Sequence, residues 1–113
     1  MIEAHSIAQI ALARRFGLAP APAAMILHLY KARSPQSELQ ISEGAGTSIG
    51  SIRVHLSHIR SALGSGSLPP QGNWGCPRYK LSTEARSEIR AILADMAQEV
   101  SHYLAPLIAQ EAA

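Results

Sequence analysis

The segment between residues 41 and 63 constrains the fold of this chain more than any other part of the sequence. Its first residues favour a short helix that runs into Gly44-Ala45-Gly46, and a second helical pattern follows at once. In that second pattern the apolar side chains fall on one side of a helix and the polar ones on the others: Ile52, Leu56, Ile59 and Leu63 against Arg53, Ser57, His58, Arg60 and Ser61. Because glycine lets a chain bend sharply, the segment predicts two short helices joined by a tight turn, the second with a free polar face.

The size and composition of the chain limit it to one small domain with an aliphatic core. It has 113 residues and a hydrophobic content of 47%, but only one Phe, one Trp and three Tyr, so Leu, Ile, Ala and Val must fill the core. The net charge of +2 and the pI of about 9.0 permit a nucleic-acid partner without requiring one. The distribution of charge is more informative. Arg53, Arg60, Arg78 and Lys80 follow one another with no Asp or Glu between them, which is typical of a surface that faces DNA.

Several features argue against other classes of protein. Cys76 is the only cysteine, which rules out an intrachain disulfide and a cysteine-rich zinc site, and we expect a reduced thiol without a role. His55 and His58 lie three residues apart, but no carboxylate or cysteine is near them in sequence, so we predict no metal and no other cofactor. The sequence has no phosphate-loop or His-Glu-x-x-His motif, and we predict that the protein is not an enzyme.

The sequence contains no segment that predicts a membrane or an export route. No apolar run approaches the roughly 20 residues that a bilayer-spanning helix needs. The first residues lack the basic region followed by an apolar stretch that defines a signal peptide. We therefore expect a cytoplasmic protein without a membrane partner.

Helical spacing and turn-forming residues divide the chain into five expected helices and a β-hairpin. We expect helices at about 2–16, 21–33, 35–44, 48–63 and 83–104, and a strand at 78–81. Ser34, Ser48, and Ser82 or Thr83 are the expected N-caps of the last three helices. The stretch 66–81 is rich in Gly, Ser and Pro and predicts the hairpin. The expected fold class is mainly α with a small β-hairpin.

Two stretches of the sequence resemble known DNA-binding patterns. Residues Ser42–Leu56 resemble the general bacterial helix-turn-helix signature, in which a glycine such as Gly46 ends the turn and an aliphatic residue such as Ile52 follows six positions later. Residues 52–63 resemble the recognition helix of the winged-helix output domains of bacterial response regulators. Arg78-Tyr-Lys-Leu81 resembles the strand that closes the wing in that family.

The resemblance implies a winged helix-turn-helix domain over residues 18–82, with helical extensions at 1–17 and 83–113. The chain departs from the family in three respects. The sequence shows no receiver domain with a phosphorylatable aspartate ahead of residue 18, so we do not expect phosphorelay control. Ala62 stands where the family has a basic residue, which removes an expected phosphate contact. A helix also takes the place of the family's N-terminal four-stranded sheet.

The resemblance, together with the position of each side chain on the expected recognition helix, implies a DNA-binding surface. Its residues are Ser48, Ser51, Arg53, Val54, Ser57, His58 and Arg60, with Arg78 and Lys80 from the wing. Arg53 suits a bidentate contact with guanine, Ser57 a base or a phosphate, and Val54 a thymine methyl group. We expect four further residues to contact the DNA backbone: His58, Arg60, Arg78 and Lys80. The alternative for each arginine is a solvated surface charge.

Three further side chains have expected structural roles. His55 falls where the recognition helix turns inward, and we expect it to be half-buried and hydrogen-bonded. Trp74 lies in the glycine-rich loop and either anchors the wing or lies exposed against a DNA backbone or a partner. We expect Tyr79 to pack against the recognition helix.

The C-terminal helix carries more apolar surface than a small domain needs to bury: Ile92, Met96, Val100, Tyr103 and Leu107 recur at helical spacing. We expect a homodimer through this helix, and the alternative is that it folds back on its own domain. The function that follows is that of a sequence-specific, double-stranded DNA-binding transcriptional regulator of bacterial or phage type. The alternative is a winged-helix module for protein–protein interaction that does not bind DNA.

Overall fold

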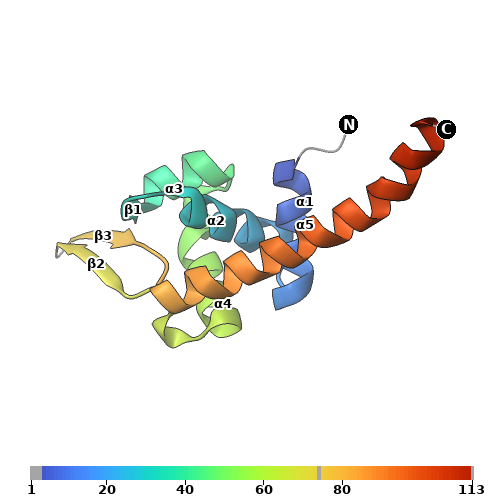
Figure 1. The fold of residues 1–113 in the computed structure, drawn as a ribbon. Coiled ribbons are helices and arrows are strands. Elements are labelled where there is room, and N and C mark those ends of the chain that lie inside the picture. Colours follow the sequence, from blue (N-terminus) through green and yellow to red (C-terminus); the bar gives the residue numbers. More distant parts are fainter. Residues whose placement is uncertain (1–3, 74, 113) are drawn as a thin grey trace.

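The computed structural model describes residues 4–73 and 75–112, which form five helices and a small antiparallel sheet (Figure 1). The helices are α1 (Ala4–Phe16), α2 (Pro20–Lys31), α3 (Glu38–Ala45), α4 (Ile52–Leu63) and α5 (Thr83–Ala112). The strands are β1 (Gln36–Ser37), β2 (Pro70–Asn73) and β3 (Cys76–Tyr79), and two short 3-10 turns, η1 (Ile49–Ser51) and η2 (Ser65–Ser67), flank α4. The prediction of a mainly α chain with a small β-hairpin is confirmed.

The sheet has the strand order β1-β3-β2, and both of its pairings are antiparallel. β2 and β3 form the expected hairpin, in which Asn73 lies opposite Cys76. The predicted strand at 78–81 is two residues out of place, because the strand ends at Tyr79 and Leu81 enters the core with 3% exposure. β1 pairs with the other side of β3 and was not predicted, since two residues are too few to show an alternating pattern.

The structure corrects the predicted starts of two helices. Ser37, and not Ser34, is the N-cap of α3: its hydroxyl accepts a hydrogen bond from the Gln40 N–H at 3.1 Å. The Gln40 side chain in turn accepts from the Ser37 N–H at 2.9 Å, so the two residues form a capping box. Ser48 makes no side-chain capping hydrogen bond, and η1 separates it from α4, which begins at Ile52. In both cases residue type favoured a serine near the start of the helix, whereas backbone geometry decides where the cap forms.

The last helix is longer than predicted. α5 ends at Ala112 rather than near residue 104, and Pro106 lies inside it. Proline removes one backbone donor, but the neighbouring residues include several strong helix formers such as Ala and Leu, which favour continuation. α2 begins at Pro20, one residue before the predicted start, because the fixed φ of proline suits the first turn of a helix.

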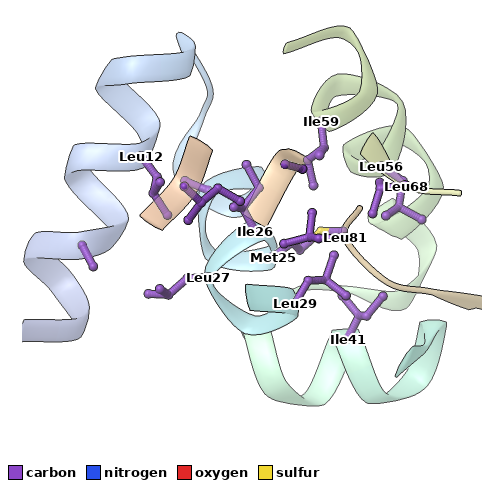
Figure 2. Close-up of a cluster of buried hydrophobic side chains, with 14 of the residues drawn as sticks. Leu12, Met25, Ile26, Leu27, Leu29, Ile41, Leu56, Ile59, Leu68 and Leu81 are labelled. Atoms are coloured by element: carbon purple, nitrogen blue, oxygen red, sulfur yellow. The ribbon is translucent and has the colours of Figure 1, made fainter. Parts of the chain in front are cut away.

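An aliphatic core surrounds α2 (Figure 2). Met25, Ile26 and Leu29 of this helix are at most 1% exposed. Around them lie Leu12 from α1, Ile41 from α3, Leu56 and Ile59 from α4, and Leu68 and Leu81 from the segments that flank the hairpin. The buried hydrophobic residues of the described ranges include no aromatic side chain, which confirms the predicted aliphatic core.

α5 packs on the core through its first turns and then projects beyond it (Figure 1). Ala85, Ile89 and Ile92 are buried, and α1 lies against both α2 and α5. Because the rest of α5 continues past the domain, the molecule is 62 Å long and only 26 and 24 Å across. The fold therefore presents two separate surfaces: the α4 face beside the hairpin, and the α1–α5 side.

Candidate nucleic-acid interface

The turn between α3 and α4 forms as the glycine pattern predicts. Gly46 is the C-cap of α3 and has a φ of 68°, in the left-handed region that favours glycine. The Thr47 N–H donates to the Ser42 carbonyl at 3.1 Å, and the Ser42 hydroxyl donates to the Thr47 carbonyl. These bonds tie the last turn of α3 to Thr47, the residue that follows the glycine.

The polar face of α4 is exposed, as expected from its periodicity. Ile52, Leu56 and Ile59 are at most 1% exposed and hold the helix on the core. On the opposite side, the side chains of Ser48, Arg53, Val54, Ser57, His58 and Arg78 are exposed, whereas those of Ser51, Arg60 and Lys80 are half-buried. The structure thus places the nine predicted residues on α4, on or directly before the η1 turn, and on or directly after the adjoining strand β3.

An acidic residue, Glu38, lies within this basic surface, and the charge pattern of the sequence did not predict it. Its Oε2 accepts a hydrogen bond from Arg53 Nε at 3.1 Å and from the Tyr79 hydroxyl at 3.3 Å. The Glu38 side chain is 19% exposed, and that of Arg53 is 78% exposed. The stretch from Arg53 to Lys80 is free of acids along the chain, but packing of α3 beside β3 adds a carboxylate in space.

Tyr79 joins the hairpin to this acidic group. Burial raises the pKa of the Tyr79 hydroxyl, the Glu38 charge and the hydrogen bond to it raise this pKa further, and Arg53 and Arg60 lower it by a smaller amount. The phenol is therefore neutral at pH 7 and acts as a donor to the carboxylate. Tyr79 also packs against the core, and its predicted contact with the recognition helix stays a prediction.

Arg60 has an intramolecular contact that its sequence position did not indicate. Its side chain is half-buried, and Nη2 donates to the carbonyl of Leu68 at 3.4 Å. This bond links the last turn of α4 to the segment that enters the hairpin. Arg60 therefore has a structural contact in addition to its predicted role at the DNA backbone.

His55 is half-buried as predicted, whereas the predicted hydrogen bond is not found at its Nδ1. Its Nδ1 is buried and has no hydrogen-bond partner among the described residues. The rings of His55 and His58 lie 6.3 Å apart between centroids, and the described ranges contain no group of three or more His, Cys, Asp or Glu side chains able to hold a metal ion. The prediction for Trp74 falls outside the described residues.

A second surface, which we call the α1–α5 groove, lies away from α4. Its volume is about 430 Å³, and its apolar lining is formed by Ile7, Ile10, Ala11, Ile92, Met96 and Val100. Arg14 and Arg15 line it from α1, and Asp95 and Glu99 line it from α5. Across the ranges that the structure covers, none of these four charges takes part in an ion pair. Fold-back of the C-terminal helix, the predicted alternative to dimerisation, is therefore realised only in part, because α5 contacts α1 but leaves this groove open.

No protein-family model, curated protein sequence or solved structure matches this chain. Over the residues that the structure covers, no single helix has both the length and the apolar composition needed to cross a bilayer. Within the described ranges, α1 and α2 meet those two criteria when taken together, and a bend of 114° separates them.

Proposed function

We propose that this chain is a winged helix-turn-helix protein that binds double-stranded DNA in a sequence-specific manner and acts as a transcriptional regulator of bacterial or phage type. The observation that carries the proposal is the exposed polar face of α4, which adjoins a hairpin with an exposed arginine, Arg78. The order α2, β1, α3, α4, β2, β3 with the sheet order β1-β3-β2 supports it, because a winged helix has this arrangement. The proposal implies a cytoplasmic location, where the DNA is.

In this proposal α4 is the recognition helix and the β2–β3 hairpin is the wing. The major groove of B-DNA admits one α-helix, and side chains on its outer face reach the base edges. Arg53 and Ser57 supply donors there, and the exposed methyl groups of Val54, which is 56% exposed on a polar face, suit a thymine methyl group. Arg78 and Lys80 supply positive charge from the wing for phosphates or the minor groove.

The first test is fluorescence-anisotropy titration of a random-sequence duplex at two salt concentrations. The protein with Arg53→Ala and Arg78→Ala lacks two exposed cations of the proposed interface. We expect its affinity at low salt to be at least tenfold weaker, and the log-log slope of its salt dependence to be shallower by about one for each phosphate that is no longer neutralised. The matched control is Lys31→Ala with Arg90→Ala, which removes the same charge from exposed positions elsewhere and is expected to change affinity by less than about threefold.

One observation favours the alternative, a winged-helix module for protein–protein interaction. Glu38 neutralises part of the positive charge on the α4 face, through its ion pair with Arg53. A folded wild-type protein that shows no binding to DNA at low salt would contradict the DNA proposal and support this alternative. Equal binding by the Arg53→Ala, Arg78→Ala variant would contradict the placement of the interface.

We further propose that the protein works as a homodimer through the α1–α5 groove. The few cations near α4 predict weak binding by one copy, and two half-sites are the common remedy in small DNA-binding proteins. The groove is suited to a second copy because it carries two basic side chains on α1 and two acidic ones on α5. A two-fold axis brings the basic edge of one copy to the acidic edge of the other, so the surface is complementary to itself.

Charge reversal tests the dimer. One variant carries Arg14→Glu and Arg15→Glu, and the other carries Asp95→Arg and Glu99→Arg; all four side chains are exposed. Light scattering after size-exclusion chromatography should show a wild-type dimer, a monomer for each variant alone, and a dimer in their equimolar mixture. Arg90→Glu, an exposed reversal outside the groove lining, should remain dimeric. A monomeric wild type, or variants that dimerise as well as the wild type, would contradict the proposal.

A further inference from the structure

Arg53 is held by one of its five N–H donors only. Its Nε donates to Glu38 Oε2 at 3.1 Å, and within the described ranges neither of its Nη nitrogens has a hydrogen-bond partner. The side chain is nevertheless 78% exposed. The contact therefore fixes the inner part of the guanidinium and leaves its outer end, with four donors, open to a ligand.

Three interactions restrain Glu38. It is the first residue of α3, directly after the Ser37 N-cap, so its backbone is fixed by the capping box. Its carboxylate also accepts from the Tyr79 hydroxyl at 3.3 Å, and β3 carries that tyrosine. A negative charge in the first turn of a helix is favoured by the helix dipole. A carboxylate held in this way, and only 19% exposed, is a fixed point for a long and otherwise mobile side chain.

We propose that Glu38 is a positioning residue that sets Arg53 for recognition of guanine at one position of the DNA site. This inference rests on the proposed function of the α4 face. The two Nη groups match the O6 and N7 acceptors of guanine in the major groove, and the Nε–H is not needed for that contact. Glu38 thus selects the base without touching it, because Arg53 reaches the groove already oriented.

Positioning and simple charge neutralisation predict different guanine preferences when Glu38 is removed. Loss of a carboxylate from a DNA-facing surface removes repulsion of the phosphates, so binding to random DNA becomes stronger in either case. If Glu38 also orients Arg53, the preference for guanine becomes weaker, since the side chain must be ordered on binding. We expect that preference to fall about fivefold, which corresponds to the ordering of one flexible side chain.

The test begins with selection of binding sites by the wild-type protein from a pool of randomised duplexes. At each selected guanine, competition titrations then give the ratio of affinities for that base and its substitutes. The variants are Glu38→Ala, which removes the acceptor, and Glu38→Gln, which keeps an amide oxygen as acceptor but removes the charge. Arg53→Ala reports which guanine depends on that arginine. Glu43→Ala is the matched control, because it removes an exposed carboxylate from the same helix.

We expect one guanine whose preference disappears in Arg53→Ala, falls about fivefold in Glu38→Ala, falls less in Glu38→Gln and is unchanged in Glu43→Ala. Circular dichroism and thermal melting establish that each variant is folded. A Glu38→Ala protein that keeps the full guanine preference, or an Arg53→Ala protein that loses none, would overturn the inference while leaving DNA binding intact. A wild type that enriches no sequence would overturn sequence-specific binding itself, and the inference with it.

Discussion

Replacement of Gly44 by alanine tests how closely α2 and α3 pack behind the candidate recognition helix. Gly44 lies inside α3 and has ordinary helical geometry, so alanine introduces no backbone strain. A β-carbon at this position would, however, overlap the His28 ring of α2, which it would meet at Cε1 and Nδ1, with Nε2 only 2.9 Å away. The ring must then move, and its Nε2 loses the hydrogen bond that it donates to Gln36 Oε1 at 3.0 Å.

The net effect follows from two opposing contributions. In a helix interior, alanine is more favourable than glycine by about 0.5–1 kcal/mol. Displacement of the His28 ring costs the net value of one hydrogen bond, about 1 kcal/mol, and an overpacking term of about 1–3 kcal/mol. We therefore expect Gly44→Ala to lower the free energy of unfolding by about 1–3 kcal/mol, which for a domain of this size is a melting temperature lower by roughly 5–15 °C.

A double-mutant cycle with urea or thermal unfolding isolates the overlap. When His28→Ala has already removed the ring, only the helix-propensity contribution remains, and Gly44→Ala is expected to stabilise the protein by about 0.5–1 kcal/mol. Gly50→Ala is the control, because its β-carbon would meet only Ser48 Oγ at 3.8 Å. If Gly44→Ala stabilised the protein with His28 in place, the close packing of α2 on α3 described above would be refuted.

Three further outcomes are expected from unfolding measurements. Arg86 lies 4.9 Å above the Tyr30 ring and donates to two carbonyl groups at the end of α2, so Arg86→Ala should cost about 1–2 kcal/mol and Arg90→Ala, an exposed cation on α5, almost nothing. Ser37→Ala removes half of the capping box and should cost about 1 kcal/mol; no loss would show that the α3 cap is unimportant. The pKa of Tyr79 is raised from 10.0 in the folded state, so the folded state holds that proton more tightly and stability falls as the pH rises above 10.0. Tyr79→Phe should lose less stability over that range, and an equal pH dependence of the two proteins would contradict the raised pKa of Tyr79.

The overall architecture was largely predictable from local sequence patterns. The apolar spacing of α4 predicted which of its residues are buried, and the glycines at 44 and 46 predicted where α3 stops to within one residue, because both are properties of a few consecutive residues. The element bounds were less predictable. Ser34 and Ser37 are both of a residue type suited to an N-cap, but only Ser37 is followed three residues later by a glutamine that completes a capping box.

The sequence predicted which residues form the candidate site, but not which charges surround them. The polar face of α4 and the arginine of the wing followed from periodicity and from the order of the elements. The charges around that surface could not be predicted in the same way. Glu38 lies 15 residues from Arg53 and 41 from Tyr79 in sequence, and no local pattern relates residues at such separations. The unpartnered Nδ1 of His55 is likewise a property of its packed surroundings.

Propensity and periodicity over a few residues specify the helices, the turn between α3 and α4, the hairpin and the aliphatic composition of the core, so all of these can be read along the chain. Contacts between side chains of different elements cannot be predicted from local sequence. Examples are those of Glu38 with Arg53, of Arg86 with the end of α2, and of His28 with Gly44. These contacts depend on the angles at which helices pack, and the packing of all the side chains at once sets those angles. For that reason a surface that is basic along the chain contains a fixed carboxylate in space.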